Sequence, residues 1–231
     1  MNTSTKYLLL NQMSILDSLT ESEKQRLAEL SVYKNLTKDD FIYRTNQKIS
    51  HVFLVEKGAV FVGRKTSFNK PIIKDIIYDN SIFGENVFTK QEFRTDYAQV
   101  LKPSKVFCIP LAYFEHLFKS NRQFAFEMTS LMIERLKHIE SRIQNFVFLK
   151  AKERIGSFLK ETAGKKGIKI GIDEILINLG LSHKELAYIT DTSRQTVARV
   201  LGEFKKSNII HFSDRKPGKI LIRDLNALSF G

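Results

Sequence analysis

The chain has 231 residues, 42% of them hydrophobic, and its 37 Lys and Arg against 25 Asp and Glu give a formal net charge of +12. This length permits two domains with a core each, and the cationic excess favours a polyanionic partner such as DNA, although a solvated basic surface is the alternative. One cysteine excludes a disulfide framework within the chain. The early apolar run 8–10 is too short for an export signal or a membrane span. We therefore expect a cytoplasmic protein with no membrane partner.

The first half of the chain predicts a short helix followed by a β-rich domain. Residues 14–30 are expected to be helical, with Thr20 as N-cap and Glu23 as its capping-box partner. Lys57-Gly58 predicts a hairpin, and Asn46 predicts a tight turn with positive φ. The segments enriched in β-branched and aromatic residues are 41–43, 52–56, 60–63, 72–78, 99–101 and 105–109. Many short antiparallel strands at this spacing predict a small jelly roll or barrel.

The single cysteine, Cys108, lies in the apolar run 106–109. Apolar burial makes a thiol inert. A structural thiol is therefore favoured over a redox sensor.

A glycine-containing segment within this domain has the residue types that bind a phosphate. Gly84, Glu85 and Asn86 are followed by Arg94 and Thr95. A guanidinium matches a phosphate, a carboxylate accepts from a hydroxyl, and glycine permits a close backbone approach. The segment 82–95 resembles the phosphate-binding cassette of cyclic-nucleotide-binding domains. The resemblance implies that the glutamate takes the ribose 2′-hydroxyl, while the arginine, the hydroxyl residue after it and amides near the glycine hold the cyclic phosphate.

Three positions depart from that family's pattern. Asp96 follows Thr95 where a small apolar residue is usual, and a carboxylate so close would repel a phosphate unless turned away. Asn86 replaces an apolar residue, and Ile139 and Glu140 occupy places where a threonine and a serine contact adenine in cyclic-AMP-binding members. The ligand is therefore expected to be a small anionic effector, cyclic AMP or another. The alternative is a structural ion pair between Glu85 and Arg94 in a ligand-free roll.

Residues 121–148 predict one long helix without Gly or Pro. Its apolar residues recur at alternating spacings of four and three, at Met132, Leu136, Ile139, Ile143 and Phe146. This spacing is typical of the seam of a two-stranded coiled coil, and we expect these residues to form a dimer interface. A core helix with one apolar side is the alternative.

The remaining segment begins with another expected helix, 150–163, whose Ile155, Phe158 and Leu159 face inward. A flexible basic turn at 164–167 and short strands at 168–172 and 176–179 are expected to follow. Between Lys150 and Gly231 there are 16 basic and 9 acidic side chains, a net charge of +7, so the basic residues are concentrated in this part of the chain.

Residues 181–210 predict two short helices joined by a tight turn. Ser182 is the expected N-cap of the first helix, with Glu185 as its partner, and Ser193 is the expected N-cap of the second. Asp191 lies at the turn, where the backbone adopts a left-handed conformation that Asp tolerates. The pattern is typical of a helix-turn-helix, and an ordinary surface helix pair is the alternative.

The second of these helices divides into two faces. The inward stripe consists of Val197, Val200, Leu201 and Phe204. Arg194, Gln195 and Arg199 lie on the outward side, where arginine can bond guanine and glutamine can bond adenine in the major groove. The other residues that we expect to bind DNA are Ser193, Thr196, His183 and Lys184, with Arg215 and Lys216 at the basic tip of a hairpin formed by 209–212 and 219–222, a wing that contacts phosphates.

The stretch SRQTVARVL, followed by NII, resembles the recognition helix and first wing strand of Crp/Fnr-type bacterial transcription regulators. In cyclic-AMP-responsive members, an arginine, a glutamate and a second arginine at these places contact bases. The resemblance assigns those roles to Arg194, Gln195 and Arg199. Because glutamine suits adenine better than cytosine, a different preferred operator base is expected at that step.

No enzyme is expected. The sequence contains no HExxH, GxxxxGK[ST], CxxC or GxSxG motif, and its five histidines have no metal-ligand spacing. The lack of a cysteine cluster argues against an iron-sulfur sensor, whereas a haem sensor stays open.

Together these patterns predict an α+β chain of two domains. Residues 1–120 would form a cyclic-nucleotide-binding-like β-roll, 121–149 a long dimerisation helix, and 150–231 a winged helix-turn-helix. The resemblance implies a homodimeric, sequence-specific regulator that binds a palindromic operator in double-stranded DNA, acts on RNA polymerase and responds to a small effector in the roll. The alternative is a constitutive DNA-binding regulator whose roll is structural or a protein-docking module.

Overall fold

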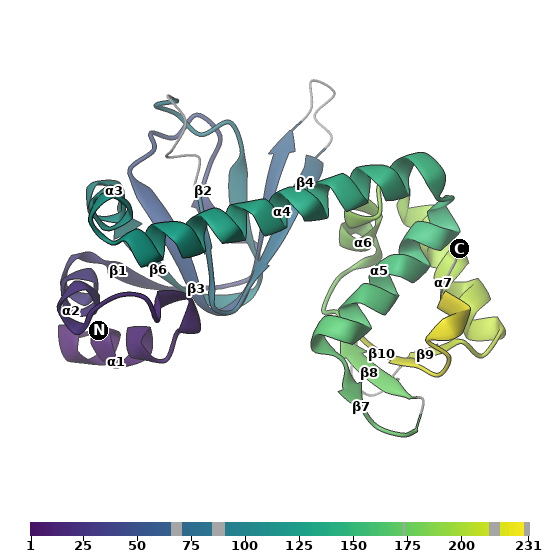
Figure 1. Cartoon of the computed structure of the whole chain (residues 1–231). Coiled ribbons are helices and arrows are strands. Elements are labelled where there is room, and N and C mark those ends of the chain that lie inside the picture. The colour runs from purple at the N-terminus through teal and green to yellow at the C-terminus, as the bar shows by residue number, and fades with distance from the viewer. Residues whose placement is uncertain (66–70, 85–90, 173, 213–217, 229–231) are drawn as a thin grey trace. The chain divides into compact units, whose positions relative to one another are not determined.

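The computed structural model describes residues 1–65, 71–84, 91–172, 174–212 and 218–228. The chain divides into two compact units, Met1–Leu136 and Lys137–Gly231 (Figure 1). The boundary lies inside one long helix, α4, Arg122–Phe148. The helix predicted over residues 121–148 is thus confirmed to within one residue.

Two helices precede the sheet of the first unit. α1, Thr3–Asn11, was not predicted, whereas α2, Glu21–Leu30, begins after the predicted capping box of Thr20 and Glu23. The predicted helix starts later than expected because this capping box fixes its first turn. Ser14–Leu16 ahead of it forms a separate 3-10 turn.

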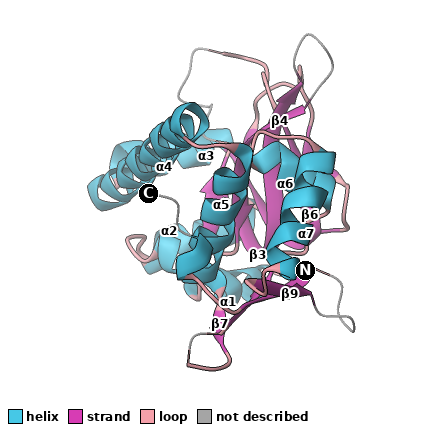
Figure 2. Cartoon of the chain, turned by 90° about the vertical axis from the view of Figure 1, so that its right-hand side faces the viewer, coloured by secondary structure: helices cyan, strands magenta, loops and turns pink. Residues whose placement is uncertain are grey.

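The first unit contains an antiparallel sheet of six strands among the described residues (strands in magenta, Figure 2). The strands are β1 Val32–Leu36, β2 Phe41–Tyr43, β3 His51–Lys65, β4 Pro71–Tyr78, β5 Ser81–Phe83 and β6 Tyr97–Pro110. The main path runs β1-β6-β3-β4, while β2 pairs with β6 and β5 pairs with β3. The expected β-rich fold is confirmed, and Asn46 has the predicted positive φ, at 64°.

The predicted hairpin at Lys57-Gly58 is wrong. β3 continues through this point with shifts of register against β6. Gly58 has φ +116°, and a Cβ there would lie 2.6 Å from the Pro103 carbonyl oxygen and 2.2 Å from the Ser104 Oγ. Glycine is therefore required by a close approach of the neighbouring strand, not by a chain reversal. The two strands expected at 99–101 and 105–109 likewise form one strand, β6.

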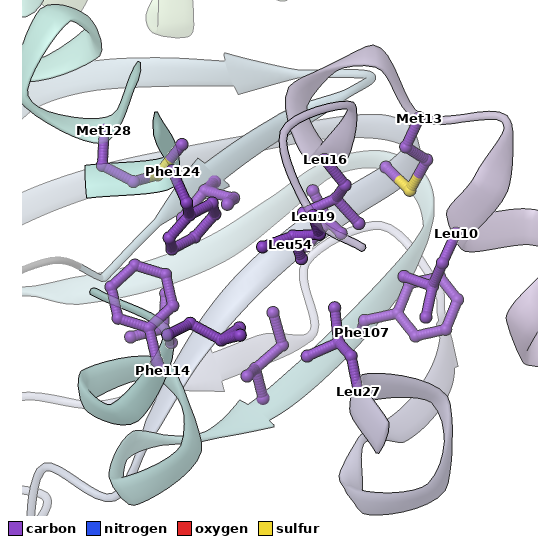
Figure 3. Packing of buried hydrophobic residues seen from close by; sticks show 14 of the residues in the cluster. Leu10, Met13, Leu16, Leu19, Leu27, Leu54, Phe107, Phe114, Phe124 and Met128 are labelled. Atoms are coloured by element: carbon purple, nitrogen blue, oxygen red, sulfur yellow. The ribbon is translucent and has the colours of Figure 1, made fainter. Parts of the chain in front are cut away.

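The two faces of the central strands bury different cores because successive side chains of a strand point to opposite sides. Leu54 and Phe107 face the core that lies under the helices. This core is completed by Phe114 of α3, Leu111–Ser120, and by Phe124 at the start of α4 (Figure 3). The opposite face forms a second core inside the roll, from residues that include Tyr43, Phe53, Val55, Phe83, Val106 and Cys108.

The second unit combines helices with a small antiparallel sheet. Its elements are α5 Ala151–Lys166, β7 Ile168–Lys169, β8 Ile175–Asn178, α6 His183–Ile189, α7 Arg194–Lys206, β9 Ile210–Phe212 and β10 Lys219–Ile222. The strand order is β7-β8-β10-β9. Ile155, Val197 and Phe204 lie in one buried core, and Phe158, predicted to face inward, is only partly buried against it.

The flexible turn expected at 164–167 is largely wrong. α5 continues to Lys166, and Gly167 follows as its C-cap, with its N–H donated to the Ala163 carbonyl. A Cβ at Gly167 would lie 2.3 Å from the oxygen of that carbonyl, whereas a Cβ at Gly164 would meet nothing within 4 Å. Only the second glycine is therefore required by the fold.

Candidate nucleic-acid interface and ligand site

Each of the two helices of the predicted helix-turn-helix begins with a side-chain cap. The Ser182 Oγ accepts the Glu185 N–H at 3.2 Å, and Glu185 Oε2 accepts the Ser182 N–H at 2.6 Å. The Ser193 Oγ accepts the Thr196 N–H at 3.0 Å. Asp191, between the helices, has φ +51°. All three predicted local features are present.

The turn between the helices is held by two arginines that the sequence pattern did not single out. Arg154 of α5 donates to the carbonyls of Leu149 at 2.7 Å, Thr190 at 2.9 Å and Asp191 at 2.9 Å. Arg142 of α4 pairs with the Asp191 carboxylate at 3.2 Å. The turn before α7 is thereby held by side chains of α4 and α5. In the sequence, the only indication of such a contact is that Arg154 directly precedes Ile155, which was predicted to face inward.

The division of α7 into two faces is confirmed. Val197, Val200, Leu201 and Phe204 are buried. Arg194, Gln195 and Arg199 are exposed, whereas Thr196 is half-buried and shares a 2.8 Å hydroxyl contact with Ser193. The capped first turns of α7 therefore present two guanidinium groups and an amide to solvent.

Arg199 makes an ion pair on its own helix. Its Nη1 bonds the Glu203 carboxylate, whose other oxygen lies 3.3 Å from the Lys152 Nζ. The hydrogen bond from Lys152 and the charge of Arg199 hold the pKa of Glu203 below its usual value. A negatively charged carboxylate thus lies beside an expected base-contacting residue.

The other expected DNA contacts are only partly described. His183 and Lys184 are exposed at the start of α6, and the Lys184 Nζ lies 6.0 Å from the centre of the Tyr188 ring. β9 and β10 pair as the sides of the expected wing. Its basic tip, with Arg215 and Lys216, lies outside the described residues.

The arginine of the cassette is buried inside the roll. The Arg94 side chain, in a residue only 2% exposed, donates to the carbonyls of Gly84 at 3.0 Å and His51 at 2.5 Å. Its guanidinium lies 4.2 Å from the centre of the Tyr43 ring. Gly84 has φ +87°, and a Cβ there would lie 3.2 Å from Arg94 Nη1. The structure therefore brings Gly84 and Arg94 together, and this close approach explains the glycine.

The structure describes only some of the other cassette residues. Thr95 is half-buried, and Asp96 is buried with its carboxylate 2.8 Å from the Lys74 Nζ. This ion pair compensates the charge that was expected to repel a phosphate. Glu85 and Asn86 lie outside the described residues, so their pairing with Arg94 stays a prediction.

α4 carries a row of exposed apolar side chains. The exposed fractions are 55% for Leu136, 49% for Ile139, 58% for Ile143 and 55% for Phe146, whereas Met132 is half-buried. Such a contiguous apolar row is unusual on the surface of a monomeric protein. The predicted dimer seam is thus available for contact.

No helix within the described ranges has the length and apolar character needed to cross a bilayer. In the same part of the chain, His, Cys, Asp and Glu side chains form no group of three or more that could hold a metal ion.

Comparisons with known proteins agree with this architecture. Residues 33–121 match the family model described as a cyclic nucleotide-binding domain, and residues 153–229 match the Crp-like helix-turn-helix domain. The chain is 26% identical to the anaerobic regulatory protein of Bacillus subtilis (strain 168), over 89% of this chain and 86% of that protein. It is 24% identical to the cAMP-activated global transcriptional regulator CRP of Salmonella typhimurium, over 80% of this chain and 87% of that protein.

A similar solved structure is that of a CooA mutant from Carboxydothermus hydrogenoformans, with a TM-score of 0.72 and 25% identity. The alignment covers 87% of both chains. The similarity therefore extends over the β-rich unit as well as the helix-turn-helix.

Proposed function

The chain belongs to the Crp/Fnr family of DNA-binding transcription regulators, and we propose that it binds a palindromic operator as a homodimer and responds to a small effector in its roll. From the operator, the dimer would act on RNA polymerase in the cytoplasm. The three-part division into roll, dimerisation helix and winged helix-turn-helix belongs to this proposal.

The division of α7 into a buried and an exposed face is the observation that carries the DNA-binding part. Arg194, Gln195 and Arg199 lie on the exposed face, and the helix that presents them is capped by Ser193 and held at its start through Arg154. Side chains on the first turns of a recognition helix contact base edges in the major groove. His183 and Lys184, at the start of α6, and Arg215 and Lys216 of the wing would add phosphate contacts.

The test is a selection of bound duplexes from a random-sequence pool at fixed salt, with the wild-type protein and Gln195→Glu. The wild type should select adenine at one step of each half-site, and Gln195→Glu should select cytosine there, because a correct side-chain pairing discriminates by about 1–3 kcal/mol. Gln25→Glu, an exposed change of the same kind on α2, is the control. An unchanged preference in Gln195→Glu would show that this side chain contacts no base.

The proposed effector is a small anion held at Gly84, Glu85, Asn86, Arg94 and Thr95. The contact between Gly84 and Arg94 supports this site, as does the similarity to a relative named cAMP-activated. A calorimetric titration with cyclic AMP tests it. Saturable heat that disappears in Arg94→Lys, which keeps the charge but loses the planar fork, supports the proposal. No heat at millimolar cyclic AMP rejects that nucleotide, and a thermal melt checks that the variant is folded.

A second candidate is a constitutive regulator whose roll is structural. Arg94 donates two hydrogen bonds to backbone carbonyls. Because those donors already have partners, this observation favours a structural roll. A footprint on the operator, repeated with and without cyclic nucleotides, separates the two candidates. Operator affinity that never changes would favour the structural roll.

A further inference from the structure

A cavity of about 350 Å³ opens in the first unit, among β1, β2, β3, β6 and the turn between β2 and β3. Arg94 lines it, but neither Gly84 nor Thr95 does. Among the described residues, the lining therefore differs from the cassette except for one shared arginine. Its volume lies at the lower end of ligand pockets, which measure about 300–1,000 Å³.

The charged side chains that line this cavity are cationic. They are Lys34 of β1, Lys48 of the turn and Arg94, and the described lining residues include no Asp or Glu. The neutral polar part of the lining consists of Gln47, Ser50 and His51. Burial, followed by the charges of Lys34 and Arg94, lowers the pKa of His51. The charges of Lys34 and Arg94 thus add to the effect of burial in disfavouring the protonated form of His51.

The rest of the lining is apolar and includes a buried thiol. Tyr43 and Phe53 stack with ring centres 5.4 Å apart, and Cys108 lies beside them in the wall. Burial raises the pKa of the Cys108 thiol, so the thiol contributes as a small apolar group at neutral pH. Aromatic walls next to a cluster of cations suit a ligand that has a flat apolar body and a negative head.

We propose that this cavity is a second ligand site, which binds a small organic anion with an aromatic or short aliphatic body. Lys34, Lys48 and the buried Arg94 would neutralise the negative head, and the Tyr43 and Phe53 rings would contact the body. The site goes beyond the proposed effector at the cassette because it requires Lys34, Lys48 and the two rings in addition to the shared Arg94, and no cyclic nucleotide.

The only cysteine of the chain provides the measurement. Cys108 lines the cavity, so a bound molecule should shield its thiol from iodoacetamide. The rate of Cys108 alkylation would be followed by mass spectrometry at pH 8.5, on the full chain without DNA. Three probes separate the parts of the proposal: phenyl phosphate has both head and body, inorganic phosphate has the head alone, and benzyl alcohol has the body alone.

Phenyl phosphate should slow alkylation at least about threefold and saturably, with matching heat in calorimetry, and inorganic phosphate should do so more weakly. Benzyl alcohol should have no effect. Lys48→Gln should raise the half-saturating concentration about tenfold, because one charge-assisted contact is lost. Lys48→Arg should restore binding, and Lys105→Gln, an exposed lysine on β6 that does not line the cavity, should leave it unchanged.

Three results would overturn the proposal: phenyl phosphate without effect, equal protection by benzyl alcohol, or identical binding by wild type and Lys48→Gln. Heat without protection of Cys108 would place the anion elsewhere and overturn it too. If inorganic phosphate protected as well as phenyl phosphate, the apolar body would play no part in recognition and that element would be rejected. This experiment does not measure operator binding. A negative result would therefore reject the second ligand site without bearing on the proposed function.

Discussion

Among the residues expected to contact bases, Arg199 already has an ion-pair partner within the protein. Its guanidinium bonds Glu203, a carboxylate that is charged at neutral pH and whose pKa is lowered further by Lys152 and Arg199. On DNA this carboxylate would lie near phosphates, where a negative charge opposes binding. If Arg199 contacts DNA as proposed, the pair would limit affinity as well as orient the arginine.

We predict that Glu203→Gln strengthens non-specific DNA binding by about two- to tenfold at low salt, because one repulsive charge is removed. The measurement is a fluorescence anisotropy titration with duplexes of unrelated sequence at several salt concentrations. Glu161→Gln, an exposed glutamate of α5 that pairs with Lys165, is the control. Equal or weaker binding by Glu203→Gln would contradict the prediction.

His51 gives a pH dependence of stability whose sign follows from its environment. Burial and the charges of Lys34 and Arg94 lower its pKa from 6.5 in the folded protein, and Lys48 lines the same cavity. The unfolded chain therefore binds a proton first as the pH falls, and stability decreases between the ordinary value and the lowered one. Above pH 7, both states are neutral at this residue and its effect disappears.

We predict that wild-type protein loses more stability between pH 7.5 and pH 5 than His51→Gln does. Urea unfolding at each pH measures the difference. Equal losses in the two proteins would show that His51 titrates alike in the folded and unfolded states.

At the scale of elements, the helix-turn-helix depends on a bond network from outside its own two helices. Arg154 of α5 joins three backbone carbonyls, two of which belong to the turn before α7. Carbonyls at a helix end need partners when they are buried or half-buried. The orientation of α7 is thus coupled to the junction between α4 and α5.

We predict that Arg154→Met destabilises the second unit by about 1–3 kcal/mol, the cost of leaving such acceptors without a charged donor. Operator affinity should fall with it, because the start of α7 loses its support. Urea unfolding monitored by circular dichroism and an operator titration measure the two effects. Arg26→Met, which breaks an exposed pair with Glu29, should cost no more than about 1 kcal/mol. An Arg154→Met protein as stable as wild type would contradict this role.

Elements whose cause is local could be predicted from the sequence. Thr20, Ser182 and Ser193 cap their helices as expected, because a capping bond joins residues three apart. Gly58 could not be interpreted locally, since the reason for a glycine there is the backbone of Pro103 and Ser104 on another strand. The same residue type is compatible with a turn or a bulge, and only the partner strand decides.

The candidate sites show the same contrast. The exposed face of α7 follows from helical periodicity within one segment. The cavity with Lys34, Lys48 and His51 could not be predicted, because its lining, which also includes Arg94 and Cys108, forms only when the strands of the roll pair. Arg94 was predicted as a phosphate ligand, but its burial against Tyr43 depends on the completed roll.

At the scale of the whole molecule, the proposed recognition of a palindromic operator would require two copies of the chain. Half-sites of a palindrome lie about 34–36 Å apart, one turn of DNA, and a two-fold dimer presents two recognition helices to them. The exposed apolar row of α4 supplies a surface on which two copies can pair. Because its side chains are about half exposed, changes there should alter association without breaking the fold of either unit.

We predict that the double substitution Ile139→Glu and Ile143→Glu yields a folded monomer, since four buried carboxylates in a dimer seam would repel one another and lose hydration. Gel filtration with light scattering measures the mass. Gln144→Glu, at an exposed polar position of the same helix, should remain a dimer. The monomer should also lose most of its operator affinity, because the second recognition helix no longer binds together with the first. A doubly substituted protein that stays dimeric would move the interface off this row, and a monomer with full operator affinity would show that one recognition helix is sufficient.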